Sequence, residues 1–417
     1  MILVLFTHSY PYDFAAEQTF LEHEISHLQR HFDKVLLVPR ITRGNRLLVP
    51  SHVEVEESLA NRYRKNVDIL STALDALGSL YFRQELRSKP RLFLQPFKLA
   101  KLLLFSGRVA FVMKWFKDWL EAHPAFHDQA LLYTYWFDEI TTGLGLVEQE
   151  YPRLKLVSRA HGYDIYEEDY FPYYWPLRRK TLAMMDKLFL ASYNGRDYFC
   201  KRYPEFSGLF ETAHLGTEDP GFISSASTDG VFRIVSCAHI LPLKRIDLLC
   251  EGIAQAATTQ PQRKFEWHHF GDGKGRQALQ KLAEKLFPSN ATGNFPGYVP
   301  NWEIMKHYQE KPVDIFVNLS TTEGGAPVAI QEAISCGIPV IATHVGGNPE
   351  IVSERNGILL KPNPTPKEVA EALIQMSDIP DLTRRMRAES RLVWEESYNA
   401  EVNFREFAEN LKAIMQS

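Results

Sequence analysis

Short apolar runs alternate with longer segments of helical periodicity along the whole chain. Alternating strands and helices are typical of doubly wound α/β domains with parallel sheets, and no internal repeat or low-complexity tract interrupts the pattern. The runs rich in β-branched and aromatic residues predict strands at 1–6, 34–39, 130–136, 155–160 and 187–192, and again at 232–238, 265–271, 314–320, 338–344 and 357–360.

One segment near the middle of the chain has neither a strand pattern nor a helix pattern. Residues 217–230, TEDPGFISSASTDG, are rich in Gly, Ser, Pro and Asp and predict a linker. A chain of 417 residues is too long for a single compact core. We therefore expect one Rossmann-like domain at 1–217 and a second at 218–395, facing each other across a cleft. Ligands of such sheets bind beyond the carboxyl ends of strands, so the polar residues there are the candidates for function.

The composition narrows the class of protein. The chain is 45% hydrophobic and 24% charged with a net charge of −4, which is typical of a globular protein and gives no sign of nucleic-acid binding. Its four cysteines are far apart and form no C-x-x-C pair, so the sequence suggests neither a disulfide framework nor a zinc site, and a reducing cytosol is the simplest location. The opening MILVLF lacks a basic region and a cleavage site, so we interpret it as a strand rather than a signal peptide. No uninterrupted apolar run is long enough to span a membrane.

The segment 82–120 departs from the strand and helix alternation. It carries nine basic residues against two acidic ones, with many Phe, Leu and Trp between them. A basic, aromatic helical pattern can lie on an anionic membrane surface. Alternatively, its apolar face packs on the first domain while the lysines are solvated. Both interpretations stay open at this point.

The stretch TTEGGAPVAIQEA, residues 321–333, follows the predicted strand 314–320. Pro327 suits a first helical turn and Gly337 the position just past a helix end, so a short helix is predicted between them. The turn before it, Gly324 to Ala326, would present free backbone N–H groups to an anion such as a phosphate.

Two glutamates flank this turn. Glu323 could accept hydrogen bonds from hydroxyls of the molecule that carries the phosphate, and Glu332 lies more than a turn into the predicted helix. The alternative is ordinary: Gln331, Glu332 and Ser335 form a solvated helix face, and Glu323 is an acidic residue near a helix N-terminus.

Other strand ends carry compatible groups. The turn after 338–344 holds Gly346 and Gly347, where a backbone could approach a ligand closely. His239, Lys244 and Arg245 follow strand 232–238, where fixed positive charge would stabilise a leaving phosphate. Alternatively, Lys244 and Arg245 only begin a solvated helix. In the first half, the end of strand 155–160 and the loop after it hold three further candidates: Arg159, His161 and Asp164.

These residues together resemble the retaining glycosyltransferases of the GT-B fold, family 4. The resemblance rests on FTHSYPYDFAAEQTFLEHEISHL, SRAHGYDIYEEDY, SCAHILPLKRIDLLCEGI, HHFGDG, VNLSTTEGGAPVAIQEAISCGIPVIATHVGGNPEIV and NGILL. It implies a nucleotide-sugar donor held by the second domain, an acceptor held by the first, and no metal or other cofactor. The absence of a D-x-D pattern agrees with this. The resemblance also implies that residues 396–417 cross back onto the first domain.

The resemblance assigns roles residue by residue. Glu323 matches a glutamate that contacts the donor sugar, Glu332 one that binds the ribose hydroxyls, Lys244 the lysine on the diphosphate, and His161 a histidine beside the transferred sugar. The acceptor hydroxyl would attack on the face that the nucleotide leaves. The candidate catalytic residues are His161, Glu323 and Lys244; the donor-binding candidates are Glu332, His239, Arg245, Gly324, Gly325, Ala326, Pro327, Val328, Gly346 and Gly347; and the acceptor-side candidates are Tyr10, Glu17, Arg159 and Asp164.

Three departures from the family pattern stand out. Eight residues separate Glu323 from Glu332 where the family has seven, so the turn is expected to bulge. His239 stands where an arginine is usual, which would make diphosphate binding weaker or dependent on protonation of the imidazole. The usual glycine pair after the first strand is replaced by SYPY, residues 9–12, so the acceptor mode does not transfer.

The leading hypothesis is transfer of a sugar from a nucleotide donor to a growing, lipid-linked bacterial surface glycan, by an enzyme in the cytoplasm or at the inner face of the cell membrane. One alternative is a nucleotide-sugar epimerase or hydrolase of the same architecture, which would need further carboxylates in the cleft. Another is a degenerate transferase that serves as a scaffold. The sequence does not specify the sugar, the nucleotide, the acceptor or the linkage.

Overall fold

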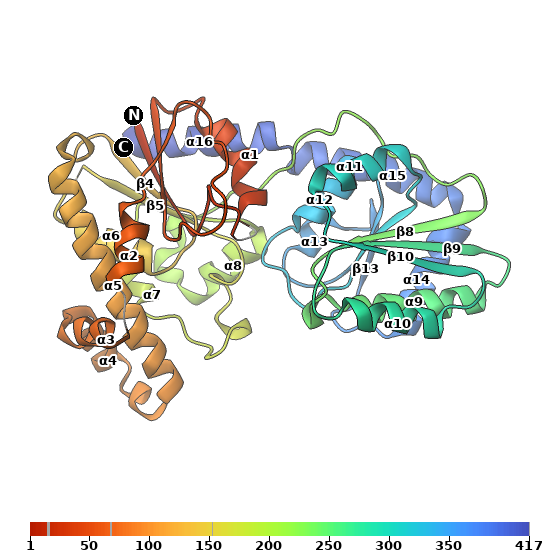
Figure 1. The fold of residues 1–417 in the computed structure, drawn as a ribbon, viewed down its shortest axis with the longest axis horizontal. Coiled ribbons are helices and arrows are strands. Elements are labelled where there is room, and N and C mark those ends of the chain that lie inside the picture. The colour runs from red at the N-terminus through yellow and green to blue at the C-terminus, as the bar shows by residue number, and fades with distance from the viewer. Residues whose placement is uncertain (15–16, 67–68, 152, 417) are drawn as a thin grey trace. The chain divides into compact units, whose positions relative to one another are not determined.

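The computed structural model of the protein describes residues 1–14, 17–66, 69–151 and 153–416. Ala15 and Ala16, part of the N-terminal segment that carries the family resemblance, lie outside the described residues, as does Ser417. The chain forms two compact units (Figure 1). The first comprises Met1–Ala213 and Glu401–Ser417, and the second His214–Ala400.

The first unit is built on a seven-stranded parallel sheet in the order β3-β2-β1-β4-β5-β6-β7. Its strands are β1 (Ile2–Thr7), β2 (Lys34–Pro39), β3 (Val53–Val55), β4 (Ala130–Thr134), β5 (Lys155–Ala160), β6 (Lys187–Leu190) and β7 (Phe210–Thr212). Its helices are α1 (Gln18–Leu28), α2 (Ser58–Asn66), α3 (Ile69–Gly78), α4 (Leu80–Ser88), α5 (Pro96–Ala122), α6 (Glu139–Glu148), α7 (Arg178–Leu182), α8 (Tyr193–Arg202) and nearly all of α16 (Ala400–Gln416).

The second unit contains a six-stranded parallel sheet in the order β10-β9-β8-β11-β12-β13. Its strands are β8 (Val231–Cys237), β9 (Lys264–Phe270), β10 (Ala291–Gly297), β11 (Ile315–Asn318), β12 (Val340–Thr343) and β13 (Gly357–Leu360). Its helices are α9 (Ile246–Thr259), α10 (Arg276–Leu286), α11 (Asn301–Glu310), α12 (Val328–Ser335), α13 (Asn348–Ile351), α14 (Pro366–Asp378) and α15 (Pro380–Ser397).

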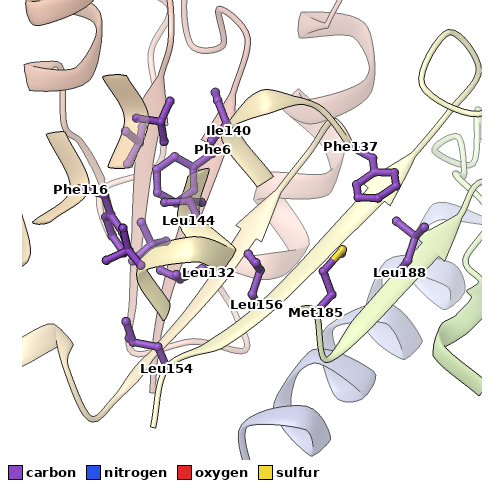
Figure 2. Packing of buried hydrophobic residues seen from close by; sticks show 14 of the residues in the cluster. Phe6, Phe116, Leu132, Phe137, Ile140, Leu144, Leu154, Leu156, Met185 and Leu188 are labelled. Atoms are coloured by element: carbon purple, nitrogen blue, oxygen red, sulfur yellow. The ribbon is translucent and has the colours of Figure 1, made fainter. Parts of the chain in front are cut away.

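Both sheets are covered on both faces, and each face has its own apolar core. In β1, Val4 and Phe6 join the cluster under α5 and α6, while Leu3 and Leu5 join the cluster under α1 and α16. This follows from the two-residue period of a strand. Figure 2 shows Phe6, Phe116, Leu132 and Leu156 packed together in the first of these cores. In the second unit, α9, α10 and α14 cover one face and α11, α12 and α15 the other (Figure 1).

The predicted parallel α/β architecture is confirmed, and a strand forms at each of the ten predicted positions. Three strands of the structure, β3, β7 and β10, are not among those predicted from the sequence. All three lie at sheet edges and pair with a single neighbour. Their side chains are only partly buried, as in β10, where Ala291 and Gly297 alone are buried, so these strands need fewer apolar residues than interior strands. The segment ATGNFPG of β10 accordingly lacks the apolar run of an interior strand.

The basic segment 82–120 is mostly the long helix α5. Its apolar residues from Leu102 to Leu120 pack into the core of the first unit, as the packing alternative predicted. The largely exposed apolar side chains of the segment lie before this stretch, at Phe93, Leu94 and Phe97. The exposed apolar side chains of the segment therefore lie in its first part, whereas Arg108 and Lys114 are exposed farther along α5. Within the described residues, no helix combines the length and hydropathy needed to cross a bilayer.

Candidate functional site

The turn before α12 is held in place by a glutamine inside the helix. Gln331 is 1% exposed, and its Nε2 donates to the carbonyl oxygen of Ala326 at 2.9 Å. Gly337, with φ of +69°, ends the helix as predicted. Pro327 lies just before the first helical residue rather than within the first turn. Gln331 and Ser335 are buried, so the solvated-face alternative is wrong for these two residues.

The two Gly-Gly turns pack against each other. A β-carbon on Gly346, whose φ is +49°, would lie 1.6 Å from the carbonyl oxygen of Glu323. One on Gly347 would lie 2.2 Å from the carbonyl carbon of Gly325. Only glycine permits this approach, because any side chain would displace the backbone of the neighbouring turn. Gly346 and Gly347 therefore fix the shape of the 323–326 turn.

Lys244 and Glu323 form an ion pair at this turn. The Lys244 Nζ lies 2.6 Å from Glu323 Oε1, and both side chains are largely shielded from solvent. Asn318, at the end of β11, donates from Nδ2 to the same carboxylate oxygen at 3.3 Å. The backbone N–H of Thr321 donates to the carbonyl of Leu243 at 2.8 Å, which ties the two loops together. The structure thus brings two predicted catalytic residues into contact although they are far apart in the sequence.

Arg245, the residue after Lys244, connects two loops through hydrogen bonds to the backbone. It adopts a left-handed conformation with φ of +48° and begins α9. Its guanidinium donates to the carbonyl oxygens of Leu319, Ser320 and Pro362 at 2.6 to 2.9 Å. These bonds hold the end of β11 against the loop after β13. The donors of Arg245 are therefore directed at backbone, which favours a positioning role.

Glu332 and His239 lie near the carboxyl end of β8. Glu332 Oε1 accepts a hydrogen bond from Asn301 Nδ2 at 2.7 Å. Burial first, and then the negative charge of Glu332, raise the pKa of the Cys237 thiol to about 12. Glu332 therefore contributes to the electrostatic environment of Cys237, the last residue of β8. His239, two residues farther on, is exposed.

In the first unit, His161 follows β5 and packs between aromatic rings. Its ring centroid lies 4.3 Å from that of Tyr135 and 4.8 Å from that of Trp136. Neither ring nitrogen has a hydrogen-bond partner among the described residues. Burial, and secondly the charge of Arg159, lower the pKa of His161 well below its ordinary value. The imidazole is therefore neutral at physiological pH and carries a free acceptor nitrogen.

Glu17 organises the loop after β1. Its carboxylate accepts hydrogen bonds from the backbone N–H groups of His8, Ser9 and Tyr10 at 2.8 to 3.0 Å and from Trp136 Nε1 at 2.7 Å. Successive amides that converge in this way form an anion-binding nest. The protein's own carboxylate fills it, and Glu17 is only 3% exposed. These bonds hold the loop after β1 to Glu17, the residue that precedes α1.

The other acceptor-side candidates are buried. Arg159 pairs with Glu24 at 2.9 Å in a core fully shielded from solvent. Asp164 accepts from the backbone N–H groups of Phe137, His161 and Gly162, which ties the loops after β4 and β5 together. The ring of Tyr10 belongs to the core under α1. In the structure these three side chains make their contacts within the first unit, and their part in binding an acceptor stays a prediction.

The match to known families falls on the second unit. Residues 222–393 match the family model of Glycosyl transferases group 1. This region contains Lys244, Glu323, Glu332 and both Gly-Gly turns, and it covers less than half of the chain.

Curated relatives point to the same chemistry. The chain is 23% identical over 273 residues to a putative colanic acid biosynthesis glycosyltransferase, WcaL, of Escherichia coli K12, a match over 63% of this chain and 65% of WcaL. It is 30% identical over 155 residues to a D-inositol 3-phosphate glycosyltransferase of Streptomyces bingchenggensis, over 36% of this chain and 33% of the relative. The chain thus covers just under two thirds of WcaL.

Solved structures show the fold. The lipopolysaccharide outer core galactosyltransferase WaaB in its apo form superposes with a TM-score of 0.70 at 14% identity, over 99% of both chains. The Anabaena protein HepE, in complex with UDP and glucose, superposes with a TM-score of 0.66 at 18% identity, again over 99% of both chains. With the two parallel-sheet units, these superpositions confirm the predicted GT-B fold.

Sequence reasoning missed a charged network in the first unit. Arg40, directly after β2, contacts Asp138 Oδ2 at 3.3 Å and Glu139 Oε1 at 2.8 Å, and its Nη2 lies 2.5 Å from His8 Nδ1. Arg108 on α5 also contacts Glu139 Oε1, at 3.3 Å. The sequence does contain a feature that could have indicated this network. Arg40 directly follows the predicted strand 34–39, and Asp138 and Glu139 come soon after the predicted strand 130–136, so all three lie at strand ends where ligands bind. Burial and the neighbouring Glu139 raise the pKa of Asp138.

Proposed function

We propose that the protein is a retaining glycosyltransferase of family 4 type that moves a hexosyl group from a nucleotide-sugar donor to a glycan acceptor. The observation that carries the proposal is the Lys244–Glu323 pair at the head of α12, within the region that matches Glycosyl transferases group 1. The UDP bound to the structurally similar HepE supports a nucleotide donor.

The donor would be held by the second unit. Lys244 would bind the diphosphate and share its charge with the departing phosphate, while Glu323 would turn from Lys244 to hydroxyls of the donor sugar. Glu332 would accept hydrogen bonds from the ribose. His239, with an exposed imidazole, would lie near the diphosphate. The backbone N–H groups of Gly324, Gly325, Ala326 and Val328 would line the phosphate and sugar, with Pro327 shaping the turn between them, because the helix N-terminus favours negative charge there.

The reaction would proceed on one face of the sugar. The acceptor hydroxyl attacks the anomeric carbon from the side on which the diphosphate leaves, and the departing phosphate oxygen takes the hydroxyl proton. The C–O bond to the phosphate breaks as the new glycosidic bond forms, so the anomeric configuration is retained. The neutral imidazole of His161 would accept a hydrogen bond from the transferred sugar. This scheme requires no metal ion and no cofactor besides the donor.

The acceptor would be a lipid-linked glycan of a bacterial surface polysaccharide. Relatives named for the biosynthesis of colanic acid and amylovoran support a polysaccharide product. The exposed apolar residues before the buried part of α5, together with the lysines and arginines around them, support peripheral contact with the inner face of the cell membrane. No contact with nucleic acid is part of the proposal.

An activity assay tests this function. The purified protein is incubated with a panel of nucleotide sugars, with and without lipid-linked saccharides extracted from bacterial membranes, and release of nucleoside diphosphate is followed. We expect release that depends on the acceptor, a product of retained anomeric configuration by NMR, and a loss of about 10²-fold or more in kcat for Lys244→Ala.

Three outcomes would count against the proposal. Donor consumption without acceptor would indicate an epimerase or hydrolase. An inverted product would exclude the retaining mechanism. Full activity in both Lys244→Ala and Glu332→Ala would place the chemistry elsewhere.

A further inference from the structure

The first unit contains a cavity that the donor site does not use. Its volume is about 440 Å³, within the range of small-molecule binding pockets. It lies at the carboxyl ends of β2, β4 and β5, where the strand order of the sheet reverses between β1 and β4. Ligands of open α/β sheets bind at such a switch point. The lining residues are Arg40, Phe97, Ala100, Lys101, Leu104, Phe105, Arg108, Asp138, Glu139, Tyr163 and Trp175.

The charges of the cavity leave one cation without an acidic partner. Arg40 and Arg108 pair with the carboxylates of Asp138 and Glu139. Lys101 is different: its Nζ lies 4.5 Å from the ring centroid of Trp175, and none of the described carboxylates is within ion-pair distance. Burial, and secondly the charge of Arg178, lower the pKa of Lys101, and the more distant carboxylates of Glu167 and Glu139 offset this only in part. An anionic ligand would restore the balance of charge around this ammonium group.

The mouth of the cavity is apolar and exposed. Phe97, one of the lining residues, is 65% exposed, and its ring centroid lies 5.2 Å from that of Phe171, which is 63% exposed. The ring of Tyr173 also contacts Phe171, at 5.8 Å between centroids. Phe93 and Leu94, in the turn just before α5, are exposed as well. Large apolar side chains gathered in this way mark a binding surface.

We propose that this cavity binds the phosphate or diphosphate of an amphiphile, with Lys101 on the anionic group and Phe97 and Phe171 on the apolar chain. The cavity supplies the cation and its mouth supplies the apolar contact, so the two parts of the ligand are recognised by adjacent surfaces. The inference rests on the proposed function and assigns the lipid-linked acceptor to a defined pocket in the first unit. A free phosphorylated sugar would share the contact with Lys101 but would gain nothing from the aromatic mouth.

Direct binding of two probes tests the assignment. Farnesyl diphosphate, below its micellar concentration, and inorganic pyrophosphate are titrated calorimetrically into the full-length protein. All titrations use a Lys244→Ala background, which removes the proposed diphosphate contact of the second unit. Lys101→Met keeps the aliphatic stem over Trp175, and Lys101→Arg keeps the charge. Lys114→Met, on the exposed part of the same helix, is the matched control.

The expected affinities distinguish recognition of the anionic group from recognition of the apolar hydrocarbon chain. Lys101→Met should weaken both probes at least tenfold, Lys101→Arg should restore most of the affinity, and Lys114→Met should leave it unchanged. Phe97→Ser combined with Phe171→Ser should weaken farnesyl diphosphate at least tenfold and leave pyrophosphate unchanged. Circular dichroism of each variant checks that it is folded.

Two results would overturn the assignment. Equal affinity of Lys101→Met and the parent for both probes would remove the anion site. Equal affinity of the parent for pyrophosphate and farnesyl diphosphate would exclude the amphiphile and leave a free phosphate compound as the ligand. Neither result depends on a nucleotide sugar, so failure here is distinct from failure of the proposed transferase activity.

Discussion

Gly347 is the residue at which the shape of the donor turn can be tested most simply. Its β-carbon position lies 2.2 Å from the carbonyl carbon of Gly325, and its φ is not in the left-handed region, so an added methyl group acts by volume alone. We expect Gly347→Ala to destabilise the protein by about 1–3 kcal/mol and to weaken nucleotide binding at least tenfold, because the 323–326 turn must shift. Chemical denaturation and calorimetric titration measure the two effects.

Gly208→Ala is the matched control. A β-carbon at Gly208 would have no atom within 4 Å, so this change should alter the free energy of unfolding by less than about 0.5 kcal/mol. If Gly347→Ala behaves like the control in both measurements, the packing of the two Gly-Gly turns does not shape the site.

Single residues could be selected from the sequence, but their partners could not. The rule that ligands meet strand ends selected Lys244, Glu323 and His161. It gave no information on the contact between Lys244 and Glu323, which depends on two loops after β8 and β11 that only the fold brings together. The direction in which a side chain points could not be predicted from the sequence either. Arg245 has the positive charge and the strand-end position expected of a phosphate-binding residue, yet its guanidinium donates to backbone carbonyls.

At the scale of one element, the end of α6 offers a test of electrostatics. Glu148 is its last residue, half-buried near Asp186, and burial first and Asp186 second raise its pKa from 4.5 to about 7. A carboxylate at a helix C-terminus is also disfavoured by the helix dipole. We expect Glu148→Gln to stabilise the protein by about 1 kcal/mol above pH 7, a value reduced from the full shift because the group is partly screened by solvent.

The pH dependence has a definite sign. The pKa of Glu148 is higher in the folded state, so between pH 4.5 and about 7 the unfolded state loses its proton first and wild type loses stability as the pH rises. The gain from Glu148→Gln should therefore vanish below pH 4.5 and grow above it. Urea denaturation at several pH values measures the gain. Glu121→Gln, an exposed glutamate near the end of α5, is the control, and an equal pH profile for both variants would contradict the interpretation.

Elements were predictable where the pattern of apolar residues is strong. Interior strands such as β1 and β11 are apolar on both faces because helices cover both sides of each sheet, and they were recognised. The edge strands β3, β7 and β10 lack that signal. In α5 the apolar residues were visible, but whether they face a core or a membrane depends on neighbouring elements. The structure packs apolar residues from Leu102 to Leu120 into the core and leaves Phe93 and Phe97 exposed.

At the scale of the whole molecule, each of the two units carries different candidate residues. The second unit matches a glycosyltransferase family and holds the proposed donor residues. The first carries His161, the Glu17 nest and a cavity with an apolar mouth. The sequence predicted two parallel-sheet domains because strand and helix alternation and chain length are global properties. It did not reveal the cavity, which is assembled from α5 and loops after three different strands.

The most direct test of the central claim is calorimetric titration of nucleoside diphosphates into wild type, Lys244→Ala and Glu332→Ala. UDP, GDP, ADP and TDP are used in turn, and thermal denaturation verifies that each variant is folded. We predict that wild type binds at least one of them with a Kd of roughly micromolar order and that each substitution weakens it at least tenfold, or about 1.4 kcal/mol. Binding of none of the four, or equal binding by all three proteins, would contradict the donor site at Lys244, Glu323 and Glu332.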